Sequence, residues 1–203
     1  AVSLDDEVVE GTRGQQGYIR NSNAHTVSSI HFSGVINAPE GGEVLKVETS
    51  QLAKAGTIKV QDGKTASIFI EKLADDGVFI DAFSSTSSEE NSENLNPNAK
   101  TSLALDGGTG VTETYLDDAH YANEGDAEEQ IVIKKAGNYL LTLNAVFQGG
   151  SARANPRLSV EVNGQAVSGA ESTAHYIRQS DGHSESSGSL VAMLNDLAVD
   201  DVV

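Results

Sequence analysis

The chain has 203 residues, a formal net charge of −17 and no cysteine. So acidic a composition argues against nucleic acid as a partner, because phosphate binding needs clustered lysine and arginine. The lack of cysteine excludes disulfides, thiolate metal sites and cysteine nucleophiles. Because no apolar run approaches the roughly 20 residues of a membrane-spanning helix, we also expect no membrane insertion.

A sequence motif near the start of the chain is repeated near its end. Residues 18–29 read YIRNSNAHTVSS and residues 176–187 read YIRQSDGHSESS, so the pattern YIRxSxxHxxSS occurs twice, 158 residues apart. The same register pairs Val2 with Val160 and Val44 with Val202. Internal repeats of this kind are typical of arrays or duplicated modules. The candidate assembly residues are those that the two motif copies share, namely Tyr18, Ile19, Arg20, His25, Tyr176, Ile177, Arg178 and His183.

Short apolar or alternating runs predict strands along most of the chain. In chain order they cover Val44–Thr49, Gly56–Val60, Ala66–Lys72, Gln130–Lys134, Asn138–Phe147 and Arg157–Val162. Asp62-Gly63 and Asn163-Gly164 are typical of two-residue hairpin turns, since these residues tolerate positive φ. A helical turn or less is expected at Gln51–Ala55 and Asp117–Ala122. The spacing of the strands predicts an all-β, antiparallel β-sandwich.

Residues 84–100, SSTSSEENSENLNPNAK, divide the chain into two parts. This acidic, Ser/Asn-rich stretch holds too little apolar surface to offset the entropy of ordering it, so we interpret it as a linker. The expected parts are residues 1–83 and 101–203. A calcium-binding loop is the alternative, because Glu89, Glu90 and Glu93 offer hard oxygen ligands.

A family resemblance follows from the second part. Residues 131–147, IVIKKAGNYLLTLNAVF, resemble the "apolar strand, Ala-Gly-x-Tyr, long apolar strand" segment of the tumour necrosis factor and complement globular-head (C1q-like) superfamily. The Asn163-Gly164 turn and the closing Asp200-Asp201-Val202-Val203 also resemble that family's order of signals. The resemblance implies a jelly-roll β-sandwich that forms trimers and binds rather than catalyses. The aromatic content of 5% is low for the trimer core that this family implies.

In the register of this resemblance, residues 1–83 contain the C-terminal-type part of one module. Residues 101–203 contain the N-terminal-type part of a second module. The missing strands would come from further copies in a tandem array or from a neighbouring subunit by β-strand addition. A simple duplication of a smaller sandwich is the third possibility. We therefore expect the partner to be a second copy of the chain, in a homo-oligomer or filament.

The sequence signals for catalytic or metal sites are weaker than the signals for this architecture. His25 and His183 stand near serine pairs, but no GxSxG elbow accompanies them, so packing and hydrogen bonding explain them better than a Ser-His hydrolase. His31, His120 and His175 lack the spacing of a zinc site. The acidic residues between Asp117 and Glu129 could hold a glycosidase pair, which is the least favoured alternative.

The sequence thus predicts a non-enzymatic structural module of an extracellular filament, surface layer or virion appendage, with no cofactor beyond the calcium alternative. The runner-up is a ligand- or receptor-binding trimeric head, such as a viral fibre tip or a carbohydrate-binding module. The absence of tryptophan and the scarcity of tyrosine disfavour a carbohydrate platform.

Overall fold

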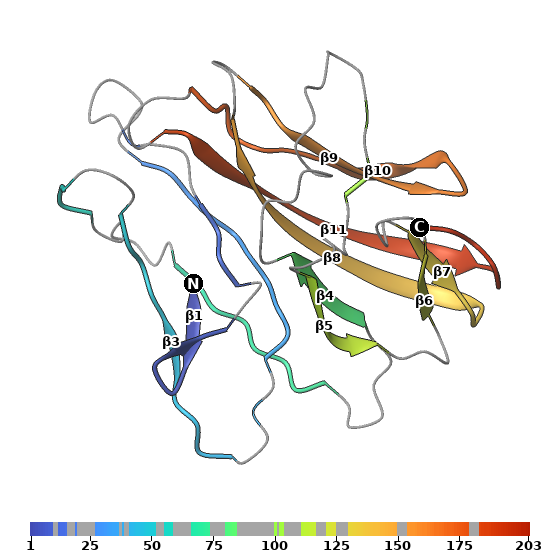
Figure 1. The fold of residues 1–203 in the computed structure, drawn as a ribbon, viewed down its shortest axis with the longest axis horizontal. Coiled ribbons are helices and arrows are strands. Elements are labelled where there is room, and N and C mark those ends of the chain that lie inside the picture. The colour runs from blue at the N-terminus through green and yellow to red at the C-terminus, as the bar shows by residue number, and fades with distance from the viewer. Residues whose placement is uncertain are drawn as a thin grey trace.

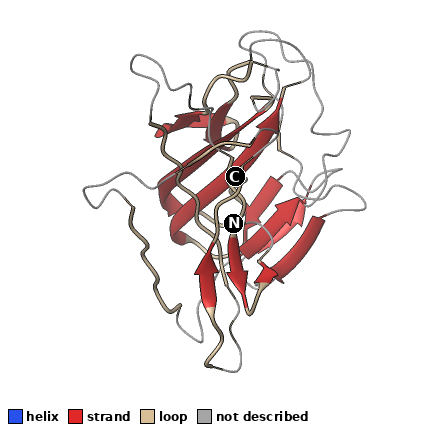
Figure 2. Ribbon diagram, turned by 90° about the vertical axis from the view of Figure 1, so that its left-hand side faces the viewer, coloured by secondary structure: helices blue, strands red, loops and turns tan. Residues whose placement is uncertain are grey.

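The computed structural model describes residues 1–9, 12–15, 19, 27–36, 38, 41–51, 55–58, 66–73, 80–84, 100, 102–103, 111–116, 121–124, 130–149, 154–178 and 183–203. In these residues the regular secondary structure consists of antiparallel strands, as predicted for an all-β chain (Figure 2). The strands are β1 Val2–Leu4, β2 Glu7–Val8, β3 Leu45–Val47, β4 Ile80–Ser84, β5 Val111–Leu116, β6 Tyr121–Glu124, β7 Gln130–Ile133, β8 Gly137–Gln148, β9 Arg157–Val162, β10 Gln165–Thr173 and β11 Glu185–Leu197.

The longest ladder joins β8 to β11, which cross the middle of the molecule side by side (Figure 1). Along β11, residues alternate between buried and more exposed positions from Ser186 to Leu194. This period of two is what a strand produces when one face lies on a core and the other faces away.

The buried face of β11 packs on the β9–β10 hairpin. Leu158 and Val160 of β9 belong to one buried cluster, together with Leu190, Ala192 and Leu194 of β11. Ala170 of β10 and Ile133 of β7 complete this cluster, and the partly buried residues packed against it come from residues 103–203. This cluster therefore belongs to the second part of the chain, while Val2 of β1 is buried outside it, and the arrangement is that of two packed β layers.

The β9–β10 hairpin turns at Asn163-Gly164, as predicted. The two residues have φ values of 51° and 73°, and Val162 lies opposite Gln165. Positive φ at both central positions matches the right-handed twist of the flanking strands. The strands predicted at Gln130–Lys134, Asn138–Phe147 and Arg157–Val162 correspond to β7, β8 and β9.

Two of the predicted strands are wrong where the structure describes them. Residues 55–58 and 66–73 form no strand, and Phe69 is 85% exposed between the exposed Ile68 and Ile70. An apolar run indicates that a segment suits a sheet, but a strand also needs a neighbouring edge with which to exchange hydrogen bonds. The expected helical turn over Asp117–Ala122 is also wrong at its end, where β6 begins at Tyr121. Asp62-Gly63 lies outside the described residues.

The two parts of the chain meet across the predicted linker. β4 pairs with β5, which follows the linker, and the last residue of β4, Ser84, is also the first residue of the predicted linker. Residues 85–99 lie outside the described residues, so the linker stays a prediction.

The alternation of β11 predicts losses of stability of different size for two neighbouring substitutions. Leu190→Ala should lower the free energy of unfolding by about 2–5 kcal/mol, because it leaves a cavity in the core. Val191 is 55% exposed, so Val191→Ala should cost less than about 1 kcal/mol. Urea unfolding followed by circular dichroism measures both, and equal losses would contradict the assignment of the two faces.

Candidate functional site

The second copy of the repeat motif closes a loop beside β10. Ile177 is fully buried and exchanges two backbone hydrogen bonds with Ala154, of 2.8 and 3.0 Å. His183 is 7% exposed, and its Nε2 donates to the carbonyl oxygen of Tyr176 at 2.7 Å. The two rings meet edge to face, with centroids 5.6 Å apart. The Arg178 amide donates to the carbonyl oxygen of His183 at 3.2 Å, so the four predicted residues of this copy do come together.

The first copy of the motif is described at one of its predicted residues. Ile19 is 48% exposed. Tyr18, Arg20 and His25 lie outside the described residues, and their role stays a prediction.

The serine pair that ends the second motif divides between the two faces of β11. Ser186 lies on the inner face and is fully buried. Ser187 lies on the outer face, where its hydroxyl donates to the carbonyl oxygen of Gln15 at 2.7 Å and its amide donates to the same oxygen at 2.9 Å. Ser187 therefore binds a segment of the first repeat copy to the β8–β11 sheet, which we call the central sheet.

A second contact joins the repeat copies on the same outer face. The side-chain amide of Asn144 in β8 donates to the carbonyl oxygen of Ser33 at 2.6 Å and to its hydroxyl at 3.1 Å. Residues 27–36 thus lie against the β8–β11 sheet, and they are the repeat counterpart of the first part of β11 itself.

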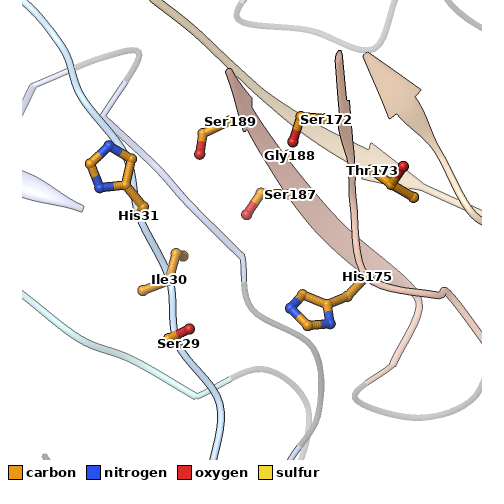
Figure 3. A pocket seen from close by; sticks show the side chains of 9 residues that line it. All are labelled: Ser29, Ile30, His31, Ser172, Thr173, His175, Ser187, Gly188 and Ser189. Atoms are coloured by element: carbon orange, nitrogen blue, oxygen red, sulfur yellow. The ribbon is translucent and has the colours of Figure 1, made fainter. Parts of the chain in front are cut away.

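An open cavity of about 350 Å³ lies between the two repeat copies. Ser29, Ile30 and His31 line one side, and their counterparts 158 residues later, Ser187, Gly188 and Ser189, line another. Ser172, Thr173 and His175 complete the wall. Figure 3 shows the imidazoles of His31 and His175 on separate segments around the hydroxyls of β11. Such a wall can hydrogen-bond a small polar ligand. Sequence reasoning missed the cavity, since a shared repeat register does not say that the copies face each other.

The outer face also exposes three apolar side chains, beside the exposed Thr142 opposite Val191. Leu140 of β8 lies opposite Met193 of β11, and both share a face with Val191. These side chains are 66%, 55% and 55% exposed. We call Leu140, Val191 and Met193 the apolar face. Contiguous exposed apolar surface is typical of interaction sites.

The hairpins β1–β2 and β9–β10 occupy repeat-equivalent positions and have the same local geometry. Asp5 and Asp6 turn with φ values of 48° and 69°, close to those of Asn163 and Gly164. The Asp5 amide donates to the carbonyl oxygen of Val44 at 3.1 Å, and the Asn163 amide donates to that of Val202 at 2.8 Å.

The side chains at these turns repeat the pattern. Oδ1 of Asp5 accepts from the Val44 amide at 2.8 Å, and Oδ1 of Asn163 accepts from the Val202 amide at 2.9 Å. Both pairs of partners are related by the offset of 158 residues. Each hairpin turn therefore binds a later segment, at Val44 or at Val202, through the same pair of hydrogen bonds.

Within the described ranges, no three histidine or acidic side chains come close enough together to hold a metal ion. Glu89, Glu90 and Glu93 lie outside those ranges, so the calcium loop stays a prediction. The same holds for His120 and for Asp117 and Glu129 of the glycosidase alternative. None of the described segments forms a helix of the length and apolarity needed to cross a membrane.

Comparison with known proteins adds no relative: no family model matches the chain, and neither a curated protein nor a solved structure matches it.

The two serines of the motif should respond oppositely to removal of their hydroxyls. In the part of the chain that the structure describes, Ser186 Oγ has no hydrogen-bond partner, so Ser186→Ala should be neutral or stabilise the fold by about 1 kcal/mol. Ser187→Ala removes the hydrogen bond that the hydroxyl donates to the Gln15 carbonyl oxygen and the one it accepts from the Gln15 amide, and it should destabilise by about 1 kcal/mol or more. Parallel urea titrations measure the difference, and a reversed order would refute these assignments.

Asp201 makes the C-terminal turn sensitive to acid. The Asn163 side chain, at 2.7 Å, and then the Ala198 amide, at 2.7 Å, donate to its carboxylate and lower its pKa from the ordinary 3.8. A carboxyl whose folded-state pKa is lowered stabilises the fold above its unfolded pKa and loses that contribution as the pH falls through the folded value. Wild type should therefore melt at a higher temperature than Asp201→Asn at neutral pH. The difference should begin to shrink as the pH falls to the ordinary pKa of 3.8 and should vanish once the pH lies below the lowered folded-state pKa; a difference that grows with acid would contradict the argument.

Proposed function

We propose that the protein is a non-enzymatic structural module that assembles with copies of itself, in an extracellular filament, a surface layer or a virion appendage. The single observation that carries this proposal is the apolar face of Leu140, Val191 and Met193 on the central sheet. In a chain of net charge −17, a contiguous apolar surface costs solubility unless another surface covers it.

The neighbouring part of the same face supports this reading. Residues of the first repeat copy lie there, through the Asn144–Ser33 and Ser187–Gln15 hydrogen bonds. The sheet thus accepts protein segments on this face within one chain, and a second copy would extend the cover over Leu140 and Met193. The jelly-roll topology and the C1q-like ancestry implied by the sequence belong to this proposal.

The alternative function is a ligand- or receptor-binding trimeric head. The observation that favours it is the cavity between the repeat copies, whose wall carries hydroxyls and the imidazoles of His31 and His175. A discrete trimer that retains a glycan or another small polar ligand, and forms no larger assembly, would support this alternative.

Sedimentation velocity tests the assembly proposal. The weight-average mass of the wild-type chain should rise with concentration. Met193→Glu, which places a charge in the apolar face, should shift this rise to at least about tenfold higher concentration, since desolvating an unpaired carboxylate opposes association.

Val199→Glu provides the matched control. Val199 is 53% exposed and follows β11, outside the apolar face, so the same change there should leave the association as it is in the wild type. A wild type that stays monomeric at every concentration, or equal effects of the two variants, would overturn the proposal.

A further inference from the structure

The two equivalent hairpins differ on their outer edges. On the side of β1 away from β2, β3 adds as an antiparallel strand, with Ser3 opposite Lys46 and Val2 opposite Val47. Ala1 and Glu48 extend this ladder with two backbone hydrogen bonds, of 2.9 and 3.2 Å. The first hairpin therefore belongs to a three-stranded sheet in the order β2-β1-β3.

On the side of β9 away from β10, the corresponding strand is missing from the described residues. In a two-residue hairpin the residues that flank the turn, here Val162 and Gln165, face each other through hydrogen bonds. The backbone groups of Glu161 and Ser159 therefore point to the outer edge, since alternate residues of a strand point to alternate sides. Among the described residues, neither has a backbone partner on that side.

The repeat fixes how a strand would meet this edge. Adding 158 to the partners of β3 places the position of Lys46 opposite Glu161 and that of Glu48 opposite Ser159. Val203 already occupies the position that corresponds to Leu45, next to Val202 at the Asn163 turn. An incoming strand would therefore pair with β9 from Lys46 onward.

Charge favours this register. Lys46 would stand directly across from Glu161, and opposite charges in directly opposed positions stabilise an antiparallel pair. In the structure Lys100 forms an ion pair with the Glu161 carboxylate. The Lys100 side chain is 65% exposed, and so exposed a pair is displaced at little cost.

The donor strand is held in its own chain by its ladder with β1 and by an ion pair of Lys46 with Asp6, and the side chains of that pair are exposed, so it contributes little. β3 has three residues and lies at the edge of its sheet, and Lys46 and Val47 are exposed. Gly41 and Gly42, which precede it, have φ values of 73° and 99°, in a region that glycine adopts at no steric cost. The segment thus buries little in its present place.

We propose that the outer edge of β9 accepts the β3 segment of a second copy of the chain as an added antiparallel strand, with Lys46 opposite Glu161. This inference rests on the proposed self-assembly and names the edge and the segment that join. Repeated from copy to copy, such a head-to-tail contact generates a filament or a ring.

Engineered cysteines test the register directly, because the chain has none of its own. One preparation carries Glu161→Cys and a second carries Lys46→Cys, so that a mixed disulfide can form only between two chains. Opposed residues of a hydrogen-bonded antiparallel pair have Cα atoms about 5.5 Å apart, within the range of a disulfide. After mild oxidation we expect at least about tenfold more heterodimer than in the controls, measured on non-reducing gels and by mass spectrometry.

Two controls accompany this pair. Val47→Cys mixed with Glu161→Cys shifts the contact by one residue and turns the thiol to the other face of the strand. Glu171→Cys mixed with Lys46→Cys places an exposed thiol on β10 instead of β9. Unchanged circular dichroism of each variant shows that it has folded.

The outcomes separate this inference from the proposed function. Cross-linking at Glu161 no greater than in the controls overturns the inference, and if Met193-dependent association persists, the self-assembly proposal stands. Preferential cross-linking of Glu161→Cys to Ile70→Cys would assign the edge to residues 66–73 and also overturn the inference. Specific cross-linking to Lys46→Cys without association through the apolar face would sustain the strand exchange and refute the role of that face.

Discussion

The structure depends on burial of one face of β11 against the β9–β10 hairpin. Leu190, Ala192 and Leu194 supply that face, and Leu158 and Val160 meet them from β9. Burial of apolar area is the dominant favourable term in folding, and it acts on both layers at once. The strict alternation of β11 then places Val191 and Met193 on the opposite face, where they are exposed. The core and the candidate interface are thus two consequences of one pattern.

Hydrogen bonds attach the first repeat copy to the central sheet, whereas apolar burial joins the two β layers. The cluster around Leu190 is drawn from residues 103–203, whereas the first repeat copy is attached to the β8–β11 sheet by hydrogen bonds at Gln15 and Ser33. An intramolecular hydrogen bond contributes only about 1 kcal/mol net to the stability of the fold, because its groups bond to water in the unfolded chain. This is far less than the contribution of a buried core. The first copy is therefore held on the central sheet rather than folded into its core, which suits a segment that other copies could also supply.

Unpaired strand edges link this arrangement to assembly. A sheet edge presents backbone donors and acceptors that pair with any compatible strand, so proteins cover their edges or use them. β1 is covered by β3, while the outer groups of Ser159 and Glu161 lack a described counterpart. The equivalence of the two hairpins, from the turn angles to the bonds of Asp5 and Asn163, makes that difference informative.

Local chemistry allowed much of the second part to be predicted. Residues 157–162 alternate cleanly and end at Asn163-Gly164, and both the strand and the turn occur as expected. The run Ile68-Phe69-Ile70 has equally strong β propensity but forms no strand, because pairing depends on a neighbour that propensity does not supply. In the motif, the burial of Ile177 agrees with the packing role expected of it, but its bridge to Ala154 joins segments whose contact no spacing indicates.

The sequence by itself determined the all-β class, the β9–β10 turn and the repeat register, since these depend on side-chain period, on residues that tolerate positive φ and on identity at a constant offset. Only the tertiary structure decided which edges are paired, which face of β11 is buried and that Ser29 and Ser187 line one cavity. The physical reason is that periodicity distinguishes the two faces of a strand without saying which neighbour covers either one. That choice rests on contacts between residues far apart in the chain.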